Sequence, residues 1–208
     1  PSFDDMESFD DALDKLSTEV QDNGEKMAKE EVLAKKYLLP LYEQGKYDYF
    51  IMDGGGERSN IADNGFYAGK STIVPLTPGE EALSAWYRTY NRVIKRLKPI
   101  GFEILAIVPN MLDRRLDQIN DDRILLERLN NSDEFSDLLP EFARVSDEDW
   151  EKFNQNEHDW LPGIRERSAI SSGISSGEPV AHHVDNCDQI KHIDTLAEIV
   201  ENGGVSNE

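Results

Sequence analysis

The chain has 208 residues, and its 42 acidic against 22 basic side chains give a formal net charge of -20 at pH 7. This length suffices for one full hydrophobic core, or for one domain with an appended helical piece. The acidity is spread along the whole chain, which disfavours phosphate backbones at ordinary ionic strength and is typical of adaptation to a salt-rich cytoplasm. No apolar run approaches the length of a membrane span, and the single Cys187 excludes a disulfide framework. We therefore expect a halophilic, cytoplasmic protein that does not enter a membrane.

Two helices are predicted at the start of the chain. Over 3–20, apolar residues recur every three or four positions, as on one face of a helix: Phe3, Met6, Phe9, Leu13, Leu16 and Val20. The turn-rich sequence QDNGE at 21–25 separates this helix from a second one over about 26–44. We assign 1–46 to a helical segment that packs on the sheet formed by the rest of the chain.

The middle of the chain alternates between predicted strands and helices. Short apolar runs predict strands over 47–53, 71–76 and 102–108, and a spacing of three or four predicts helices over 79–97 and about 116–129. Strands that alternate with helices of this length form βαβ units, in which the strands run parallel. The predicted fold class is therefore α/β, with a doubly wound parallel sheet and flanking helices.

The last part of the chain is less regular. It contains a short acidic helix over 147–154 and a stretch rich in Ser and Gly over 168–177, which predicts a loop or a weak helix. A closing helix over 189–200 carries its apolar residues on one face. We expect 203–208 to be a disordered tail.

The segment 47–53, YDYFIMD, is a β-favouring run that ends on Asp53 and opens into the glycines at 54–56. In an open parallel sheet, ligands bind in the crevice at the carboxyl ends of the strands. A carboxylate at that place is positioned to hold Mg²⁺ through a water beside a phosphate, and glycines permit close backbone approach. The same pattern also fits a buried strand that ends in a flexible polar turn.

GFYAGKST at 65–72 imitates a phosphate-binding loop, which requires G-x-x-x-x-G-K-[ST] after a strand and at the start of a helix. Asn64 occupies the position of the first glycine, and the GKST precedes the strand predicted over 71–76 instead of following one. Its amides would then pair within the sheet and would not point at phosphates. We predict that this stretch is no nucleotide site and that Lys70 is a surface residue.

Two further groups of residues have a functional and a structural interpretation. Four potential zinc ligands lie close together: His182, His183, Cys187 and His192. Their spacing matches no standard zinc pattern, so a solvated loop is the favoured interpretation. Small basic clusters occur at 95–98, 114–115 and 165–167. They suit phosphate or nucleic acid, but salt bridges and helix ends are favoured on so acidic a chain.

Four landmarks, taken in order, resemble the ParA/MinD family of deviant P-loop ATPases. YDYFIMD at 47–53 is similar to the family's Walker B strand, and VPLTPGEEAL at 74–83 to the strand and helix entry that follow it. AIVPNMLDRR at 106–115 resembles the next strand and its exit. LPGIRER at 161–167, followed by GEPV at 177–180, resembles the family's late segment. The landmarks cover about 47–202, and the plasmid and chromosome partition ATPases are the most similar branch.

The resemblance implies roles for the matched positions. Asp53 corresponds to the Walker B acid that supports Mg²⁺ through water, and Gly54 follows it directly. Asn110 corresponds to a position that often hydrogen-bonds adenine, while Pro162 and Gly163 fall in the loop that packs on the base. The implied cofactors are ATP and Mg²⁺, with Asp53 as the metal site, and no catalytic residue is assigned.

The chain also departs from the family. Glycines at 54–56 stand where the family has a small residue and prolines, and Ser172 with Gly173 replaces a Glu-Ala pair. The family's phosphate loop and its first strand would precede the segment where this chain begins. Phosphoryl transfer depends on that loop to position and neutralise the triphosphate. We therefore expect a partial P-loop NTPase-like fold that is inactive alone, and leave open whether the complete protein hydrolyses ATP.

The leading expectation is part of a ParA-like ATPase that acts in plasmid or chromosome partitioning. The resemblance implies a homodimer in the complete protein, a centromere-binding partner protein and non-specific association with DNA. One alternative is a non-enzymatic interaction module that keeps this fold without hydrolysing nucleotide. Another is a small-molecule transferase or dehydrogenase on a different doubly wound sheet, since fold alone does not determine activity.

Overall fold

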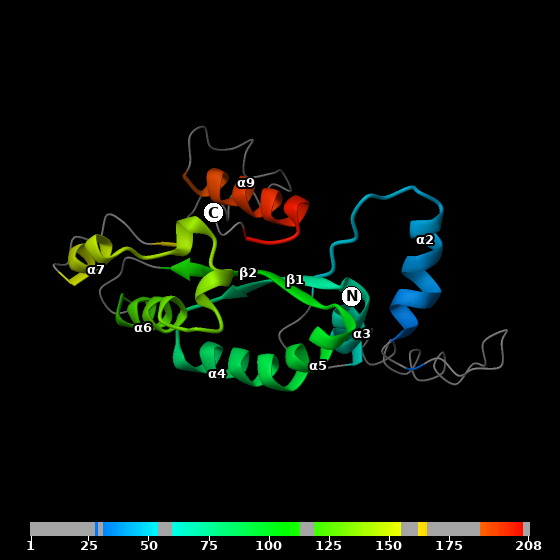
Figure 1. The fold of residues 1–208 in the computed structure, drawn as a ribbon, viewed down its shortest axis with the longest axis horizontal. Helices are drawn as coiled ribbons and strands as arrows, with labels where there is room; N and C mark the ends of the chain where they lie inside the picture. The colour runs from blue at the N-terminus through cyan, green and yellow to red at the C-terminus, as the bar shows by residue number, and fades with distance from the viewer. Residues whose placement is uncertain are drawn as a thin grey trace. The chain divides into compact units, whose positions relative to one another are not determined.

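The computed structural model describes residues 28, 31–53, 60–112, 119–154, 162–165 and 188–205. The chain divides into two compact units. The first comprises Pro1–Thr72 and Leu97–Glu103, and the second comprises Ile73–Arg96 and Ile104–Glu208. The described helices and strands give a mixed α/β architecture (Figure 1).

In the first unit, one helical segment contains the π-helical turn η2 (Leu33–Leu38) and continues as α2 (Leu39–Glu43). Pro40 explains the widened turn, because proline lacks an amide hydrogen and its ring displaces the carbonyl one turn earlier. The segment ends before Gly45, whose φ of 60° lies in the left-handed region that favours glycine. The helix predicted over 26–44 is confirmed across its described part.

Helix α3 (Asn60–Gly69) packs against the start of that helical segment. Asn64 is buried, and its Oδ1 accepts a hydrogen bond from the Leu33 N–H at 3.0 Å. Leu33 lies in the first helical turn, where backbone amides have no acceptor within the helix. Tyr67, one turn further along α3, donates its hydroxyl to Glu31 at 2.8 Å. Asn64 and Tyr67 of α3 therefore hold the start of the η2–α2 helical segment through hydrogen bonds.

We expect Asn64→Ala to lower the free energy of unfolding by about 1–3 kcal/mol, because the partly buried Leu33 amide loses its acceptor. Urea denaturation at pH 7 measures this change. Asn64→Asp is the matched control, since it retains an acceptor oxygen and should cost less. An alanine variant as stable as the unmodified chain would show that water can replace Asn64.

The strand predicted over 47–53 is wrong. These residues form neither helix nor strand, and the described sheet contains no strand from this segment. Tyr47 and Tyr49 are exposed, and Ile51 is 95% exposed. The physical reason is that β-favouring residues stabilise a strand mainly by packing against the side chains of neighbouring strands. Their intrinsic backbone preference is weak, so a β-favouring run that does not pair in the described sheet does not become a strand.

The second unit contains nearly all of a small parallel sheet in the order β1 (Ser71–Leu76), β2 (Glu103–Leu112) and β3 (Ile164–Arg165). β2 is buried continuously over 104–109, as expected for a parallel strand that is covered on both faces. The strands predicted over 71–76 and 102–108 are confirmed. The GKST motif begins at the last residue of α3, a helix that the sequence did not predict, and leads into β1, so it precedes a strand as predicted.

A continuous helical segment connects β1 to β2, which completes one βαβ unit. It consists of α4 (Glu80–Thr89), η3 (Tyr90–Ile94), α5 (Lys95–Leu97) and the 3-10 turn η4 (Lys98–Ile100). Gly101, with a φ of 88°, ends it: its N–H bonds to the Lys98 carbonyl at 3.0 Å, and the Phe102 N–H bonds to the Leu97 carbonyl at 3.3 Å. This pair of bonds is a Schellman cap, and the helix predicted over 79–97 is confirmed.

The remaining described elements are α6 (Ile119–Asn130), η5 (Ser136–Leu138), η6 (Glu141–Ala143), α7 (Asp147–Asn154) and α9 (Asp188–Asn202). Figure 1 shows α4 and α6 along one side of the sheet and α9 along the other. Ser146 precedes α7 and caps its start, because its Oγ accepts the Asp149 N–H at 3.2 Å, as in a capping box. The three helices predicted for these parts of the chain are confirmed. The segments 3–20, 168–177 and 206–208 lie outside the described residues.

Phe135 is the centre of an aromatic cluster that joins α4 and η3 to the turn after α6. Its side chain is fully buried. Its ring lies 5.7 Å from Trp86, 5.6 Å from Tyr87 and 4.9 Å from Tyr90, measured between centroids. These separations are typical of favourable tilted and edge-to-face aromatic pairs. The cluster therefore packs the crossover helix of the βαβ unit against the turn that follows α6.

Helix α9 covers the opposite part of the core. Ile199 is buried together with Leu105, Ala106 and Val108 of β2. Leu196 is partly buried against the same cluster, as expected for apolar positions on one face of an amphipathic helix. The closing helix therefore stabilises the central strand.

Candidate functional site

The carboxyl end of β2 is irregular where it meets β3. Asn110 pairs with Ile164 and Leu112 pairs with Arg165 in parallel register, so three residues of β2 oppose two of β3. The extra residue, Met111, has a φ of 59° and a side chain that is 50% exposed. Such bulges re-aim side chains at the ends of strands, and a left-handed non-glycine residue costs on the order of 1–3 kcal/mol.

The Pro162–Gly163 turn packs directly against this strand end. Both residues are buried, and Gly163 has a φ of 127°. A Cβ atom on Gly163 would lie 2.6 Å from the Pro109 carbonyl oxygen and 3.0 Å from Leu112 Cδ1. Only glycine permits this approach. The turn and the strand end, which are far apart in the sequence, are therefore held in contact.

The structure brings together three of the five predicted site residues: Asn110, Pro162 and Gly163. Asn110 is half-buried, and its carboxamide carries both a donor and an acceptor, the pair of groups that can read the edge of adenine. The end of a parallel strand is also where ligands bind in open α/β sheets. Among the described residues, Asn110 is therefore a polar side chain at the end of β2, next to the buried Pro162–Gly163 turn.

The structure does not place the other two predicted site residues, Asp53 and Gly54, in this arrangement. Asp53 belongs to the first unit and is exposed, in the segment that does not form a strand. Gly54 lies outside the described residues. The proposed roles of Asp53 at Mg²⁺ and of Gly54 beside a ligand therefore stay predictions.

Arg165 is a residue that the sequence analysis did not assign to this site. It follows Gly163 by two positions, is half-buried, and pairs with Leu112 at the end of β2. The signal was available, because the residue falls within the LPGIRER stretch of the resemblance, but it was interpreted only as a local basic spot.

The basic cluster at 95–98 has a structural role at its first residue. Lys95 Nζ lies 3.1 Å from a carboxylate oxygen of Glu134 and 5.0 Å from the centroid of the Tyr90 ring. Lys95 therefore supports the packing around Phe135, which agrees with the favoured salt-bridge interpretation. Arg114, Arg115 and Arg167 lie outside the described residues.

Across the described ranges, no three His, Cys, Asp or Glu side chains are grouped to hold a metal ion. His182, His183 and Cys187 fall outside those ranges. His192, on α9, stacks on Phe142 with ring centroids 4.3 Å apart and planes inclined by 18°. His192 therefore contributes to the packing of α9.

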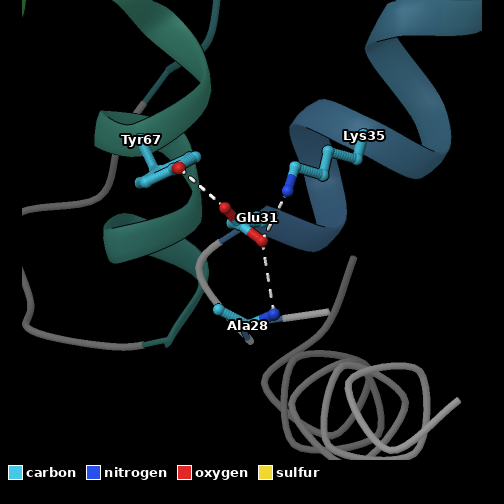
Figure 2. A network of polar contacts seen from close by, with 4 residues as sticks. All are labelled: Ala28, Glu31, Lys35 and Tyr67. Atoms are coloured by element: carbon cyan, nitrogen blue, oxygen red, sulfur yellow. Dashed lines mark hydrogen bonds and ion pairs between the residues drawn. The ribbon is translucent and has the colours of Figure 1, made fainter. Parts of the chain in front are cut away.

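A polar cluster surrounds Glu31 in the first unit (Figure 2). Its Oε2 accepts hydrogen bonds from Lys35 Nζ at 2.8 Å and from the Ala28 N–H at 3.3 Å, and its Oε1 accepts the Tyr67 hydroxyl at 2.8 Å. The Glu31 N–H returns a bond to the Ala28 carbonyl at 3.0 Å, so the pair resembles the glutamate half of a capping box. The cluster joins the start of the helix to α3.

The hydrogen bonds from Lys35 and then from Tyr67 and Ala28 lower the pKa of Glu31 below its ordinary value of 4.5, although burial opposes them. A carboxylate with a lowered folded pKa stabilises the fold above its unfolded pKa, and this contribution disappears as pH falls through the folded pKa. We expect Glu31→Gln to be less stable than the unmodified chain at pH 7. The difference should shrink below pH 4.5 in urea denaturation series, and a constant difference would contradict this coupling.

Comparison with known proteins yields no match to a family model, a curated protein or a solved structure. Among the described helices, none combines the length and apolar character needed to cross a membrane.

Proposed function

We propose that the chain is part of a ParA-like ATPase that acts in plasmid or chromosome partitioning and binds ATP and Mg²⁺ in the complete protein. The observation that carries the proposal is the contact between Pro162–Gly163 and the Pro109–Asn110 end of β2. The resemblance assigns both segments to one adenine, with Asn110 at its hydrogen-bonding edge and Pro162–Gly163 in the loop that packs on the base, and such a base site requires the segments to be neighbours. Their juxtaposition, together with the parallel sheet, supports the proposal.

In this proposal, the second unit recognises the base. Asn110 hydrogen-bonds the adenine edge, Pro162 packs on the ring, and Gly163 allows the turn to approach the strand. The triphosphate needs a separate cradle, because the chain is strongly acidic and its own GKST motif joins α3 to β1. The phosphate loop implied by the resemblance would supply that cradle.

Asp53 is proposed to steady Mg²⁺ through a bound water. Asp53 is exposed and its segment 47–53 forms no strand in the described sheet, so this role is supported by the resemblance alone. A homodimer, non-specific DNA and a centromere-binding protein are the partners that the resemblance implies.

Nucleotide titration tests this proposal. We expect the polypeptide extended through its own upstream reading frame to bind Mg-ATP in preference to Mg-GTP in concentrated KCl. Asn110→Ala should reduce that preference about tenfold, the effect of losing a hydrogen bond of about 1–2 kcal/mol. Asp53→Asn should weaken the dependence on Mg²⁺ without changing the base preference. Exposed Asp137, on η5, provides a control as Asp137→Asn, which should change neither quantity.

The leading alternative is a non-enzymatic interaction module, and the exposed run of Tyr47, Tyr49 and Ile51 favours it. Absence of nucleotide binding by the extended polypeptide would support this module. A preference for a dinucleotide would instead indicate a transferase or dehydrogenase. Either result would contradict the ParA-like proposal.

A further inference from the structure

The crossover helix between β1 and β2 concentrates positive charge on a chain that is otherwise strongly acidic. Across the whole chain, 42 acidic side chains stand against 22 basic ones, yet 82–102 contains no Asp or Glu. The same stretch contains five basic residues: Arg88, Arg92, Lys95, Arg96 and Lys98. The helix is therefore a locally positive element within a negatively charged protein.

Three of these bases, Arg88, Arg92 and Arg96, lie on the face of the helix that points to solvent, and all three are exposed. The side chains that the helix buries in the core recur every three or four positions: Leu83, Trp86, Tyr90 and Ile94. Arg88 and Arg92 each lie two positions from a buried residue on either side, which places them opposite the core. Arg96 continues the same spacing of four residues.

The widened turn η3 brings these arginines into line. In a regular α-helix, residues eight positions apart, such as Arg88 and Arg96, differ by about 80° around the axis. η3 is a π-type turn in which each residue advances the chain through a smaller angle, so this difference is reduced. The three residues therefore form a nearly straight row about 12 Å long. We name Arg88, Arg92 and Arg96 the arginine row.

The arginine row has no partner within the part of the chain that the structure describes. None of its three side chains forms an ion pair or a hydrogen bond there. Lys95, on the same helix, instead pairs with Glu134 at 3.1 Å. On a chain with a net charge of -20, three aligned arginines without a carboxylate indicate a surface that binds an anionic partner.

We propose that the arginine row binds an acidic helix of another protein, with a carboxylate at every fourth position. Successive carboxylates on such a helix rise by about 6 Å, as the arginines do, so each can meet one guanidinium through two parallel hydrogen bonds. Exposed Ser84 and Ala85 precede the row on the same face, and their small side chains leave room for a second helix. The surface includes neither Asn110 nor Asp53, and it is independent of nucleotide binding.

Two observations favour an acidic helix over a nucleic acid. Exposed Glu80 and Glu81 occupy the first turn of α4, so acids border the row on that side. Even a single DNA-binding module buries about 600–1,000 Å² of protein surface, a footprint much larger than one row of three side chains. The net charge of -20 also repels an extended polyanion more strongly than a short acidic segment.

Fluorescence anisotropy with the full chain tests the proposal. The probe is a labelled alanine-based helical peptide of about 16 residues with glutamate at every fourth position, used in about 0.1 M KCl. We expect it to bind, and we expect the triple variant Arg88→Gln, Arg92→Gln and Arg96→Gln to bind about tenfold more weakly, because three exposed ion pairs are lost. Glutamine keeps the helix propensity of arginine, so the helix itself should persist.

A matched triple variant controls for net charge. It removes the same charge from exposed positions on α6 and α9: Arg123→Gln, Arg128→Gln and Lys191→Gln. Its affinity for the peptide should stay within about twofold of the unmodified chain, because these side chains lie outside the arginine row. Equal weakening in the two triple variants would show that only net charge matters, and would overturn the proposal.

Two further probes decide the kind of partner. The same peptide with glutamine in place of glutamate should not bind, and binding of both peptides alike would overturn the proposal. A DNA duplex of about 24 base pairs should bind more weakly than the acidic peptide; tighter binding that depends on the arginine row would identify a nucleic acid and contradict the acidic helix. If the triple variant does not fold, Arg92→Gln alone should weaken peptide binding about twofold, and an unchanged affinity would count against the row.

Discussion

Replacing Phe135 by alanine is expected to lower the free energy of unfolding by about 3–5 kcal/mol, the usual cost of removing a fully buried aromatic ring. The ring contacts three aromatic neighbours, Trp86, Tyr87 and Tyr90, so its loss leaves a cavity that they can close only partly. It would also loosen the βαβ crossover, because the cluster joins α4 and η3 to the turn after α6.

Urea denaturation followed by circular dichroism measures this effect. Phe135→Leu is the first control and should cost less, since leucine refills part of the cavity. Asp137→Ala is the second, because this exposed neighbour should change stability by no more than about 0.5 kcal/mol. A Phe135→Ala chain that unfolds at the same urea concentration as Asp137→Ala would show that the aromatic cluster contributes nothing to stability.

Gly163→Ala should have the second large effect, on both stability and base recognition. A side chain at a φ of 127° is strained by about 1–3 kcal/mol, and overlap with the Pro109 carbonyl oxygen adds about 1–3 kcal/mol. Relief of this overlap would move the Pro162–Gly163 turn away from Asn110. We therefore expect lower stability, together with a weaker preference for ATP over GTP in the upstream-extended polypeptide.

Gly65→Ala is the matched control for that substitution. Gly65 lies within α3, and a Cβ atom there meets nothing within 4 Å. Alanine in a helix interior should raise stability by about 0.5–1 kcal/mol, the opposite sign to Gly163→Ala. Comparable stability of the two variants would contradict the close approach of the Pro162–Gly163 turn to β2.

Local patterns in the sequence predicted most of the described elements. The apolar run at 71–76 and the acidic stretch at 147–154 became β1 and α7 with the predicted bounds. The long periodic segment over 79–97 became the crossover helix, and KPIG marked its end through a Schellman cap. These features are local, because helix periodicity, capping and turn chemistry are set by residues within a few positions of one another.

The candidate site could be predicted only from the order of the four sequence landmarks and from their resemblance to the ParA/MinD family. The resemblance implies that Asn110 and Gly163 meet one adenine, which stays a prediction, and the structure places their segments side by side. Periodicity alone could not have paired them, since nothing local to either residue specifies a partner so distant along the chain. Arg165 lies in the LPGIRER stretch of the resemblance, where its charge indicated only a local basic cluster.

The sequence by itself determined the acidic character of the chain, its alternation of strands and helices, and the α/β class. Only the tertiary structure decided that 47–53 forms no strand in the described sheet, that Asn64 caps a helix through Leu33, and that Phe135 is a core residue in a turn. The physical reason is that strand formation, long-range capping and burial depend on contacts between distant segments. Those contacts override local propensity and leave no periodic signal of their own.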